Sequence, residues 1–343
     1  MVNALCNELI LQQSYLRQET ISSIYFGGGT PSLLSEPELD KLLTTINNHY
    51  QVAPNSEITL EANPDDLDEK ALRQMYESGI NRLSIGIQTF NEQQLRFLNR
   101  AHNALQAVQC VTLAQNVGFN NISIDLIYGI PSPDHALWKN DLAIALTLAP
   151  QHISSYCLTI EPSTVFGKWT SKGKMAPIEE EYAASQFEIL VATLTEAGYE
   201  QYEISNFCMP ELYSRHNSNY WKQEKYLGIG PGAHSYNHVS RQYNIANNTH
   251  YLKALSKNEV PFTIDNLDQK AKANEYIMTS LRTKWGCDLN QLKAKYDLDL
   301  YHTQQSYLHK LIDQKLITLS ENVIRLTNTG KLLADKITED LFV

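Results

Sequence analysis

The stretch SSIYFGGGTPSLLSEPEL, from Ser22 to Leu39, decides the fold. A β-rich run over 21–26 leads into three consecutive glycines, and Ser35 with Glu38 forms the capping-box pattern that opens a helix. A strand, a tight turn and a helix make one βα unit. The stretch therefore predicts an α/β fold in which something approaches the glycine backbone closely.

The same alternation continues along the chain. The expected strands cover 21–26, 57–62, 82–88, 121–128 and 152–158, and the expected helices between them cover 36–50, 69–78, 104–116 and 135–148. A helix over 179–197 and a strand from Tyr199 extend the pattern once more. Repeated βα units predict a parallel sheet. Because a helical stretch precedes the first visible strand, we expect this series to lack its first strand.

The chain divides into three predicted parts. Residues 1–207 hold the βα series, and 208–269 are rich in Tyr, Asn, His and Gly and favour an irregular linker region. From 270 to 343, helices near 271–283, 288–296 and 303–314 precede two short strands, LITLS and VIRLT, and a helix in 328–340. Helices followed by a small hairpin predict a C-terminal winged-helix-like α+β domain.

Composition narrows the class of protein. With 343 residues, 43% hydrophobic content and a formal charge of −10, the sequence favours a globular protein that binds neither nucleic acid nor anionic membranes. No apolar run is long enough for an integral membrane segment, so a cytoplasmic location is the expectation. The five cysteines are scattered, without a CxxC or CxxxC pair, which predicts reduced thiols and no metal site.

Polar residues follow the expected strands at their carboxyl ends. They are Gly27, Gly28, Gly29, Thr30, Glu61, Gln88 and Asp125, with Arg100 twelve residues after Gln88. In βα barrels this rim carries the functional site. Two acids, an amide and a base beside a glycine turn suit a polar, zwitterionic ligand. The alternative, a tight turn beside ordinary loop residues, explains each residue alone but not the set.

Several segments together carry a family resemblance. They are YFGGGTPSLL, LEANPDD, GINRLSIGIQTF, ISIDLIYGIP, HISSYCLTIEPST and SRHNSNYWKQEKYLGIGPGAHSYN, and the tail LTNTGKLLADKITEDLF adds to them. Over essentially its whole length the chain resembles the radical S-adenosylmethionine (SAM) family of oxygen-independent coproporphyrinogen III oxidases, and more closely its heme-chaperone branch. The resemblance implies a partial (βα)6 radical-SAM barrel lacking its first strand.

The resemblance also implies a site for S-adenosylmethionine. By similarity, the contacts of this cofactor are Gly28, Gly29, Thr30, Glu61, Gln88, Arg100 and Asp125, with the glycine turn receiving its amino-acid end. One position departs from the family, which usually has Gly where this chain has Asn99.

A second departure concerns the [4Fe-4S] cluster that intact family members hold on a CxxxCxxC loop after the first barrel strand. This sequence contains no such loop, and Cys6 alone cannot replace three thiolate ligands. The missing strand and the missing loop belong to one segment, so we expect a chain that begins late; a cluster-free descendant is the alternative. The chain as given is expected not to form a 5′-deoxyadenosyl radical, and we assign it no catalytic residue.

The segment RHNSNYW, which begins at Arg215, is the second candidate site. His216, flanked by Asn217, Tyr220 and Trp221, offers an imidazole beside flat aromatic surface, which suits heme. Taken alone, the motif fits a loop histidine packed on core aromatics better than a heme ligand. The family resemblance assigns it to heme, with His216 as the iron ligand. A pairing of Arg215 with a heme propionate rests on its charge alone.

The sequence thus favours a heme chaperone that binds heme and transfers it to a heme-accepting apoprotein, with heme-donor proteins as further partners. The rival interpretation is oxidative decarboxylation of coproporphyrinogen III, and a third is an inactive truncated fragment. His102 and His234 lie in family-like segments, NRAH and GPGAHS, and are expected to be structural.

Overall fold

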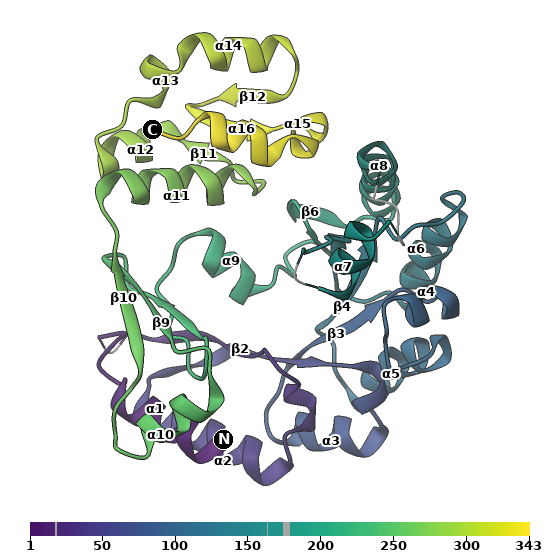
Figure 1. Cartoon of the computed structure of the whole chain (residues 1–343), viewed down its shortest axis with the longest axis vertical. Helices are drawn as coiled ribbons and strands as arrows, with labels where there is room; N and C mark the ends of the chain where they lie inside the picture. The colour runs from purple at the N-terminus through teal and green to yellow at the C-terminus, as the bar shows by residue number, and fades with distance from the viewer. Residues whose placement is uncertain (18, 163, 174–178) are drawn as a thin grey trace. The chain divides into compact units, whose positions relative to one another are not determined.

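The computed structural model describes residues 1–17, 19–162, 164–173 and 179–343. The first part of the chain contains α1 (Val2–Leu11), β1 (Ile21–Phe26), the 3-10 turn η1 (Pro31–Leu33), α2 (Glu36–His49), β2 (Val52–Ala62), η2 (Pro64–Asp66), α3 (Glu69–Glu77), β3 (Arg82–Gln88), α4 (Glu92–Phe97), α5 (Ala104–Val117), β4 (Ile122–Tyr128), α6 (Ala136–Leu148), β5 (His152–Cys157), α7 (Val165–Ser171), α8 (Glu180–Glu196), β6 (Glu200–Glu203) and β7 (Asn206–Cys208) (Figure 1).

The second part begins with α9 (Arg215–Trp221), β8 (His234–Tyr236), β9 (Ser240–Asn244), α10 (Asn248–Leu255) and β10 (Phe262–Asn266). It continues with α11 (Gln269–Leu281), β11 (Cys287–Asp288), α12 (Leu289–Tyr296), α13 (Leu300–Thr303), α14 (Gln305–Asp313), β12 (Ile317–Ser320), β13 (Val323–Leu326), α15 (Asn328–Leu332) and α16 (Ala334–Asp340). Within the described residues, no helix is both long and apolar enough to span a membrane.

The large sheet has the strand order β1-β2-β3-β4-β5-β7-β6. The pairs from β2 to β5 are parallel, as the βα pattern predicts, and β7 runs antiparallel to both β5 and β6. The segment from Tyr199, expected as one strand, is therefore two strands joined by a turn. Within this turn, Glu203 Oε1 accepts the Ser205 N–H at 3.0 Å.

The chain forms two compact units, and the border between them crosses β1 and β2. One unit comprises Tyr25–Leu34 and Ile58–Tyr213. The other comprises Met1–Ile24, Ser35–Glu57 and Ser214–Val343.

In the unit Tyr25–Leu34 with Ile58–Tyr213, the sheet has one apolar face and one polar face. The apolar face is fully buried and consists of Leu60, Leu83, Ile85, Ile87, Ile122, Ile124, Leu126 and Ile153. Alternate residues on the same strands are small or polar: Thr59, Glu61, Ser84, Ser123, Asp125 and Ser154. Because side chains alternate across a strand, this pattern puts the core on one face and leaves the other to line a site.

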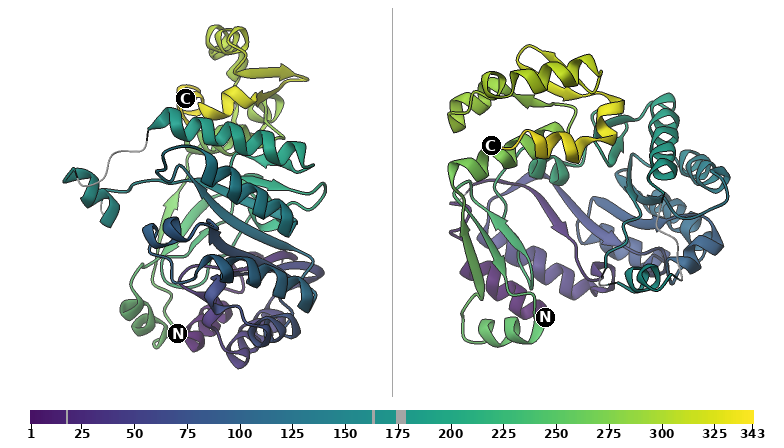
Figure 2. Two further views of the ribbon diagram at one scale, coloured as in Figure 1. Left: turned by 90° about the vertical axis from the view of Figure 1, so that its right-hand side faces the viewer. Right: turned by 45° about the horizontal axis from the view of Figure 1, so that its top comes forward.

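Residues 208–269 were expected to be irregular, and that expectation is wrong for 214–269, which lie in the unit that includes Ser214–Val343. They contain helices α9 and α10 and an antiparallel sheet of order β10-β9-β8 (Figure 2). Strand β10 pairs with β9 in the register Phe262↔Asn244. Such pairing joins segments about two dozen residues apart, so local propensity does not reveal it. The predicted part boundaries remain a prediction.

The C-terminal part, in the same unit, has its own core. Helices α11, α12 and α14 pack on the antiparallel sheet β11-β13-β12 around Ile277, Leu292, Leu308 and Ile324, all of them fully buried. The predicted hairpin LITLS–VIRLT is β12 with β13. The predicted final helix is split into α15 and α16.

Candidate functional site

The glycine turn after β1 depends on left-handed backbone. Gly28 and Gly29 have φ values of 75° and 64°, and a Cβ on either residue would meet no atom within 4 Å. Glycine is therefore required here for its conformation and not to avoid a clash. The turn ends at Thr30, which precedes η1.

Glu61, at the end of β2, holds this turn. Its Oε2 accepts the Gly28 N–H at 3.2 Å, and its Oε1 accepts the Tyr25 hydroxyl at 2.7 Å. Burial, followed by the negative charge of Glu61, raises the pKa of Tyr25 well above its usual value, so the phenol stays a donor. The carboxylate thereby links β1, the turn and β2.

Gln88, at the end of β3, has an unusual backbone. Its φ is 67°, and the register between β3 and β4 shifts between Ile85 and Gln88. The buried Asp141 supports the following residues, accepting the Thr89 hydroxyl at 2.6 Å and the Phe90 N–H at 2.8 Å. Non-glycine residues with positive φ persist where the surroundings hold them, often at functional sites.

Arg100 lies beside Asn63 and Gly86. Its Nη2 donates to Asn63 Oδ1 at 2.8 Å and to the Gly86 carbonyl at 3.2 Å, whereas its buried Nε has no hydrogen-bond partner. A Cβ on Gly86 would lie 2.9 Å from Gln88 Nε2 and 3.3 Å from Arg100 Nη2. Glycine at 86 thus leaves room for both side chains, and the unpartnered Nε is a donor that a ligand could satisfy.

Asp125 on β4 is the second acid. Ser84 Oγ donates to its Oδ1 at 3.4 Å. Burial raises the pKa of Asp125 to about 6; the hydrogen bond from Ser154 opposes this rise, and the charge of Glu61 adds to it. Near neutral pH the carboxyl group is thus close to its titration range.

These residues line one cavity of about 190 Å³. Its walls are Gly29, Thr30, Pro31, Ser32, Glu61, Ala62, Asn63, Ser84, Gly86, Gln88, Arg100 and Asp125. Every predicted cofactor contact except Gly28 is among them, and the N–H of Gly28 donates to Glu61, which does line the cavity. Asn63, Ser84 and Gly86 also line the cavity and were not among the predicted site residues. Every second residue of β3 lies on the same face as Gln88, and this alternation would have identified Gly86 and Ser84.

The cavity combines opposite charges. A guanidinium, two carboxyl groups and an open glycine turn can bind a ligand that carries an ammonium, a carboxylate and hydroxyls. Within the described residues, no group of three or more His, Cys, Asp or Glu could hold a metal ion, and the five cysteines are free thiols. The site is therefore suited to a polar organic ligand.

The raised pKa of Asp125 predicts how stability depends on pH. Between pH 3.8, the ordinary pKa of an aspartate, and about pH 6, Asp125 binds a proton in the native state that it has lost in the unfolded state. The free energy of unfolding therefore falls as pH rises through this range. Asp125→Asn removes this cost, and we expect the variant to be more stable than wild type at pH 7.5, by about 1–3 kcal/mol. The gain should vanish near pH 4, as measured by urea unfolding at both pH values.

The matched control is Asp40→Asn, at an exposed residue of α2. It should change stability little at either pH. An Asp125→Asn variant that is no more stable than wild type at pH 7.5 would contradict the proposed cost of burying this charge.

In the other unit, the segment RHNSNYW forms helix α9. Ser214 caps it by accepting the Asn217 N–H. The buried Glu57 on β2 accepts the N–H groups of Arg215 and His216, each at 3.0 Å. A carboxylate at a helix N-terminus satisfies donors that the helix itself cannot. The first turn of α9 is therefore held by a residue far away in the sequence.

Helix α9 divides the motif between two faces. His216 and Tyr220, one turn apart, contact each other edge to face at 4.9 Å, and Tyr220 packs on Tyr226 at 4.4 Å. His216 Nδ1 lies 3.4 Å from Ser23 Oγ. Burial raises the pKa of Tyr220 to about 12, so this ring is a neutral phenol. The imidazole and an aromatic surface thus lie side by side.

Asn217 and Trp221 are one turn apart on a different face. The Trp221 ring lies 5.8 Å from the Arg282 guanidinium, and Lys222 lies 4.8 Å from the ring of Trp285. These are cation–π distances. Trp221 therefore packs toward α11 and its following turn, and the structure does not group it with His216 and Tyr220.

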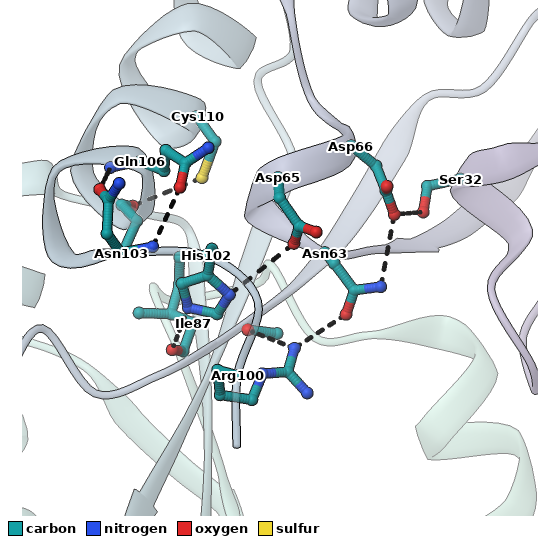
Figure 3. Close-up of polar contacts among 12 residues, drawn as sticks. Ser32, Asn63, Asp65, Asp66, Ile87, Arg100, His102, Asn103, Gln106 and Cys110 are labelled. Atoms are coloured by element: carbon teal, nitrogen blue, oxygen red, sulfur yellow. Dashed lines mark hydrogen bonds and ion pairs between the residues drawn. The ribbon is translucent and has the colours of Figure 1, made fainter. Parts of the chain in front are cut away.

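The remaining candidates have structural contacts. Arg215 Nη1 donates to the Asn55 carbonyl at 2.6 Å. His102 is buried, with Nε2 3.1 Å from the Ile87 carbonyl and Nδ1 3.9 Å from Asp65 (Figure 3). Burial lowers the pKa of His102, so this ring is neutral and supports the end of β3. His234 is exposed, stacked on Tyr243.

Comparisons with known proteins give a consistent result. The family model described as the radical SAM superfamily matches residues 6–139, and the HemN C-terminal domain matches residues 267–333. The heme chaperone HemW of Bacillus subtilis is 35% identical over 98% of this chain and 89% of its own length. Its counterpart in Lactococcus lactis is 34% identical with the same coverage, and that of Haemophilus influenzae is 33% identical over 94% and 84%.

A solved structure resembles the whole fold. Coproporphyrinogen III oxidase (HemN) from Escherichia coli, described as a radical SAM enzyme, aligns with a TM-score of 0.84 over 100% of this chain and 82% of that chain, at 21% identity. An identity this low supports the fold alone. The predicted class, a partial radical-SAM barrel with a C-terminal domain, is confirmed.

Proposed function

The chain belongs to the HemW family of heme chaperones within the radical SAM superfamily, and on that premise we propose that it binds heme and passes it to an acceptor protein. The observation that carries the proposal is the face of α9 on which His216 and Tyr220 lie together. Imidazole nitrogen is a common axial ligand of heme iron, and aromatic rings pack against the macrocycle. His216 is the proposed iron ligand, and Asn217, Tyr220 and Trp221 are candidate heme contacts.

We further propose that the cavity beside the glycine turn binds S-adenosylmethionine. The unpartnered Arg100 Nε and the open turn at Gly28 and Gly29 fit its carboxylate and ammonium groups, and Glu61 and Asp125 fit hydroxyls of its ribose. When bound, this cofactor supplies a sulfonium centre whose carbon–sulfur bonds can be cleaved. The chain's own residues bind and orient it.

The described residues do not fit a [4Fe-4S] cluster, because they offer no group of ligands for one. No step through that group is therefore assigned to this chain. The family gives a heme-accepting apoprotein as the partner, with heme-donor proteins besides. A cytoplasmic location is part of the same proposal.

The rival function is oxidative decarboxylation of coproporphyrinogen III. The similarity to HemN in fold and in the C-terminal domain favours it. The identity over nearly the whole chain favours the chaperone, since relatives at 33–35% are heme chaperones. Formation of protoporphyrinogen IX from coproporphyrinogen III by the purified chain would support the rival.

A heme titration of the wild-type chain, followed by absorbance, tests the proposed function. We expect a Soret band that shifts and saturates near one equivalent of heme, because one helix face presents the proposed ligand. A linear increase without saturation, equal to that of heme in buffer, would contradict heme binding. Titration with metal-free protoporphyrin IX should show whether binding requires the metal or only the macrocycle.

A further inference from the structure

A continuous set of polar contacts links Ser32, Asp66, Asn63 and Arg100 (Figure 3), and all of these except Asp66 line the cavity. Asp66 Oδ2 accepts the Ser32 hydroxyl at 2.6 Å and the Asn63 Nδ2–H at 3.3 Å. At the other end of the amide, Asn63 Oδ1 accepts from Arg100 Nη2 at 2.8 Å. The carboxylate is thereby linked to the guanidinium through a single amide group.

The chemistry of the two ends determines the orientation of the Asn63 amide. A carboxylate only accepts hydrogen bonds and a guanidinium only donates them. Only one orientation of the amide, with NH2 toward Asp66 and oxygen toward Arg100, satisfies both neighbours. The reverse orientation would put donor against donor and acceptor against acceptor. Asp66 therefore selects the orientation that presents an acceptor to Arg100.

Arg100 has few other contacts to hold it. Its Nη2 also donates to the Gly86 carbonyl at 3.2 Å, and its buried Nε has no hydrogen-bond partner. The two acceptors that Nη2 contacts fix the plane of the guanidinium. Loss of the Asn63 oxygen would therefore leave the guanidinium freer to rotate. An unpartnered buried Nε shows that the geometry leaves a donor for something else.

The same carboxylate also connects the opposite segment of the wall. Ser32 is buried in η1, directly after the glycine turn and Pro31. Ser32, Asn63 and Arg100 all line the cavity. Asp66 follows Asn63 by three residues in the turn η2, with its N–H donating to the Asn63 carbonyl at 3.1 Å. One side chain thus fixes both the glycine-turn segment and the cation.

We propose that Asp66 is a positioning residue of this site, which orients the Asn63 amide and through it holds the Arg100 guanidinium in place for the ligand's carboxylate. The proposal rests on the proposed binding of S-adenosylmethionine in this cavity. Asp66 itself does not line the cavity. Its effect on binding therefore passes through Asn63, and this distinguishes it from a residue that contacts the ligand.

The first test is a double-mutant cycle on the dissociation constant of S-adenosylmethionine, measured by equilibrium dialysis. Asp66→Ala and Asn63→Ala should each weaken binding about tenfold. The double variant should be no weaker than the weaker single variant, since both changes interrupt the same link. Asp66→Asn keeps an oxygen that accepts from Ser32 and Asn63, and it should retain most of the affinity. Effects that multiply, or wild-type affinity in Asp66→Ala, would overturn the proposal.

A second cycle needs no ligand, so it separates failure of this proposal from failure of the cofactor site. The changes in urea midpoint caused by Asp66→Ala and by Arg100→Ala should be non-additive when the two substitutions are combined in the wild-type background. In the Asn63→Ala background the same two changes should be additive. If wild type fails to bind S-adenosylmethionine, the proposed cofactor is wrong. This cycle still tests whether Asp66 acts on Arg100 through Asn63. Additive midpoints in both backgrounds would overturn the link. The matched control is Asp65→Ala, whose Oδ1 lies 3.9 Å from Nδ1 of the neutral His102 ring, and it should add independently to Arg100→Ala.

Discussion

Replacing His216 by alanine should abolish the saturable Soret shift, because the substitution removes the proposed iron ligand and leaves the rest of α9 in place. Ser214 caps the helix, and Glu57 accepts the backbone N–H groups of its first two residues. Neither contact needs the imidazole. Loss of an axial ligand leaves only contacts with the macrocycle. We expect the apparent dissociation constant for heme to rise at least about 100-fold, as for loss of a strong, specific contact.

His234→Ala is the matched control for this variant. His234 is an exposed histidine in the same unit, stacked on Tyr243. It should leave heme affinity unchanged, and both variants should keep the wild-type thermal midpoint within a few degrees. An unchanged titration in His216→Ala would remove His216 as the ligand, even though the family assignment would stand.

Replacing Glu61 by alanine should weaken binding of S-adenosylmethionine more than any other single change in the cavity. Glu61 both lines the cavity and accepts the Gly28 N–H and the Tyr25 hydroxyl. Its removal takes away a proposed ligand contact and the support of the glycine turn at once. Hydrogen bonds to charged groups are worth roughly 1.5–3 kcal/mol, which corresponds to about 10- to 100-fold in affinity. Isothermal titration calorimetry should measure the loss.

Glu61→Gln separates the two roles. The amide oxygen can still accept from one of the two donors, so we expect an intermediate affinity. Glu69→Ala, which removes only an exposed pair with Arg73, is the control and should bind normally. An affinity in Glu61→Ala equal to that of wild type would exclude this cavity as the cofactor site.

Most elements of the sheet were predictable, because their signals are local. The strands at 21–26 and 82–88 have the predicted bounds, and the helix expected over 104–116 is Ala104–Val117. The Ser35 and Glu38 capping box is present, and Gly118 ends α5 in the left-handed region with φ of 120°. Apolar periodicity, caps and glycine positions depend on neighbours within a few residues, so one sequence suffices to find them.

Some elements were not predictable, because distant segments decide them. In the region 214–269, β9 pairs with β10 as well as with the nearby β8. The N–H of His216, at the start of α9, donates to Glu57, which is 159 residues away. The segment after Tyr199 forms two strands, and the second of them, β7, pairs with the distant β5 as well as with β6. Local propensity is weak in such places, and tertiary contacts override it.

For the candidate sites, the sequence by itself determined which residues are present at the strand ends and in the RHNSNYW segment, and the kinds of group they supply. The tertiary structure alone decided how those groups meet. It placed Gln88 in positive φ, turned the Asn63 amide toward Arg100, and separated Trp221 from His216 on α9. The identity of a side chain is a local property, whereas its orientation is set by partners that folding brings from elsewhere in the chain.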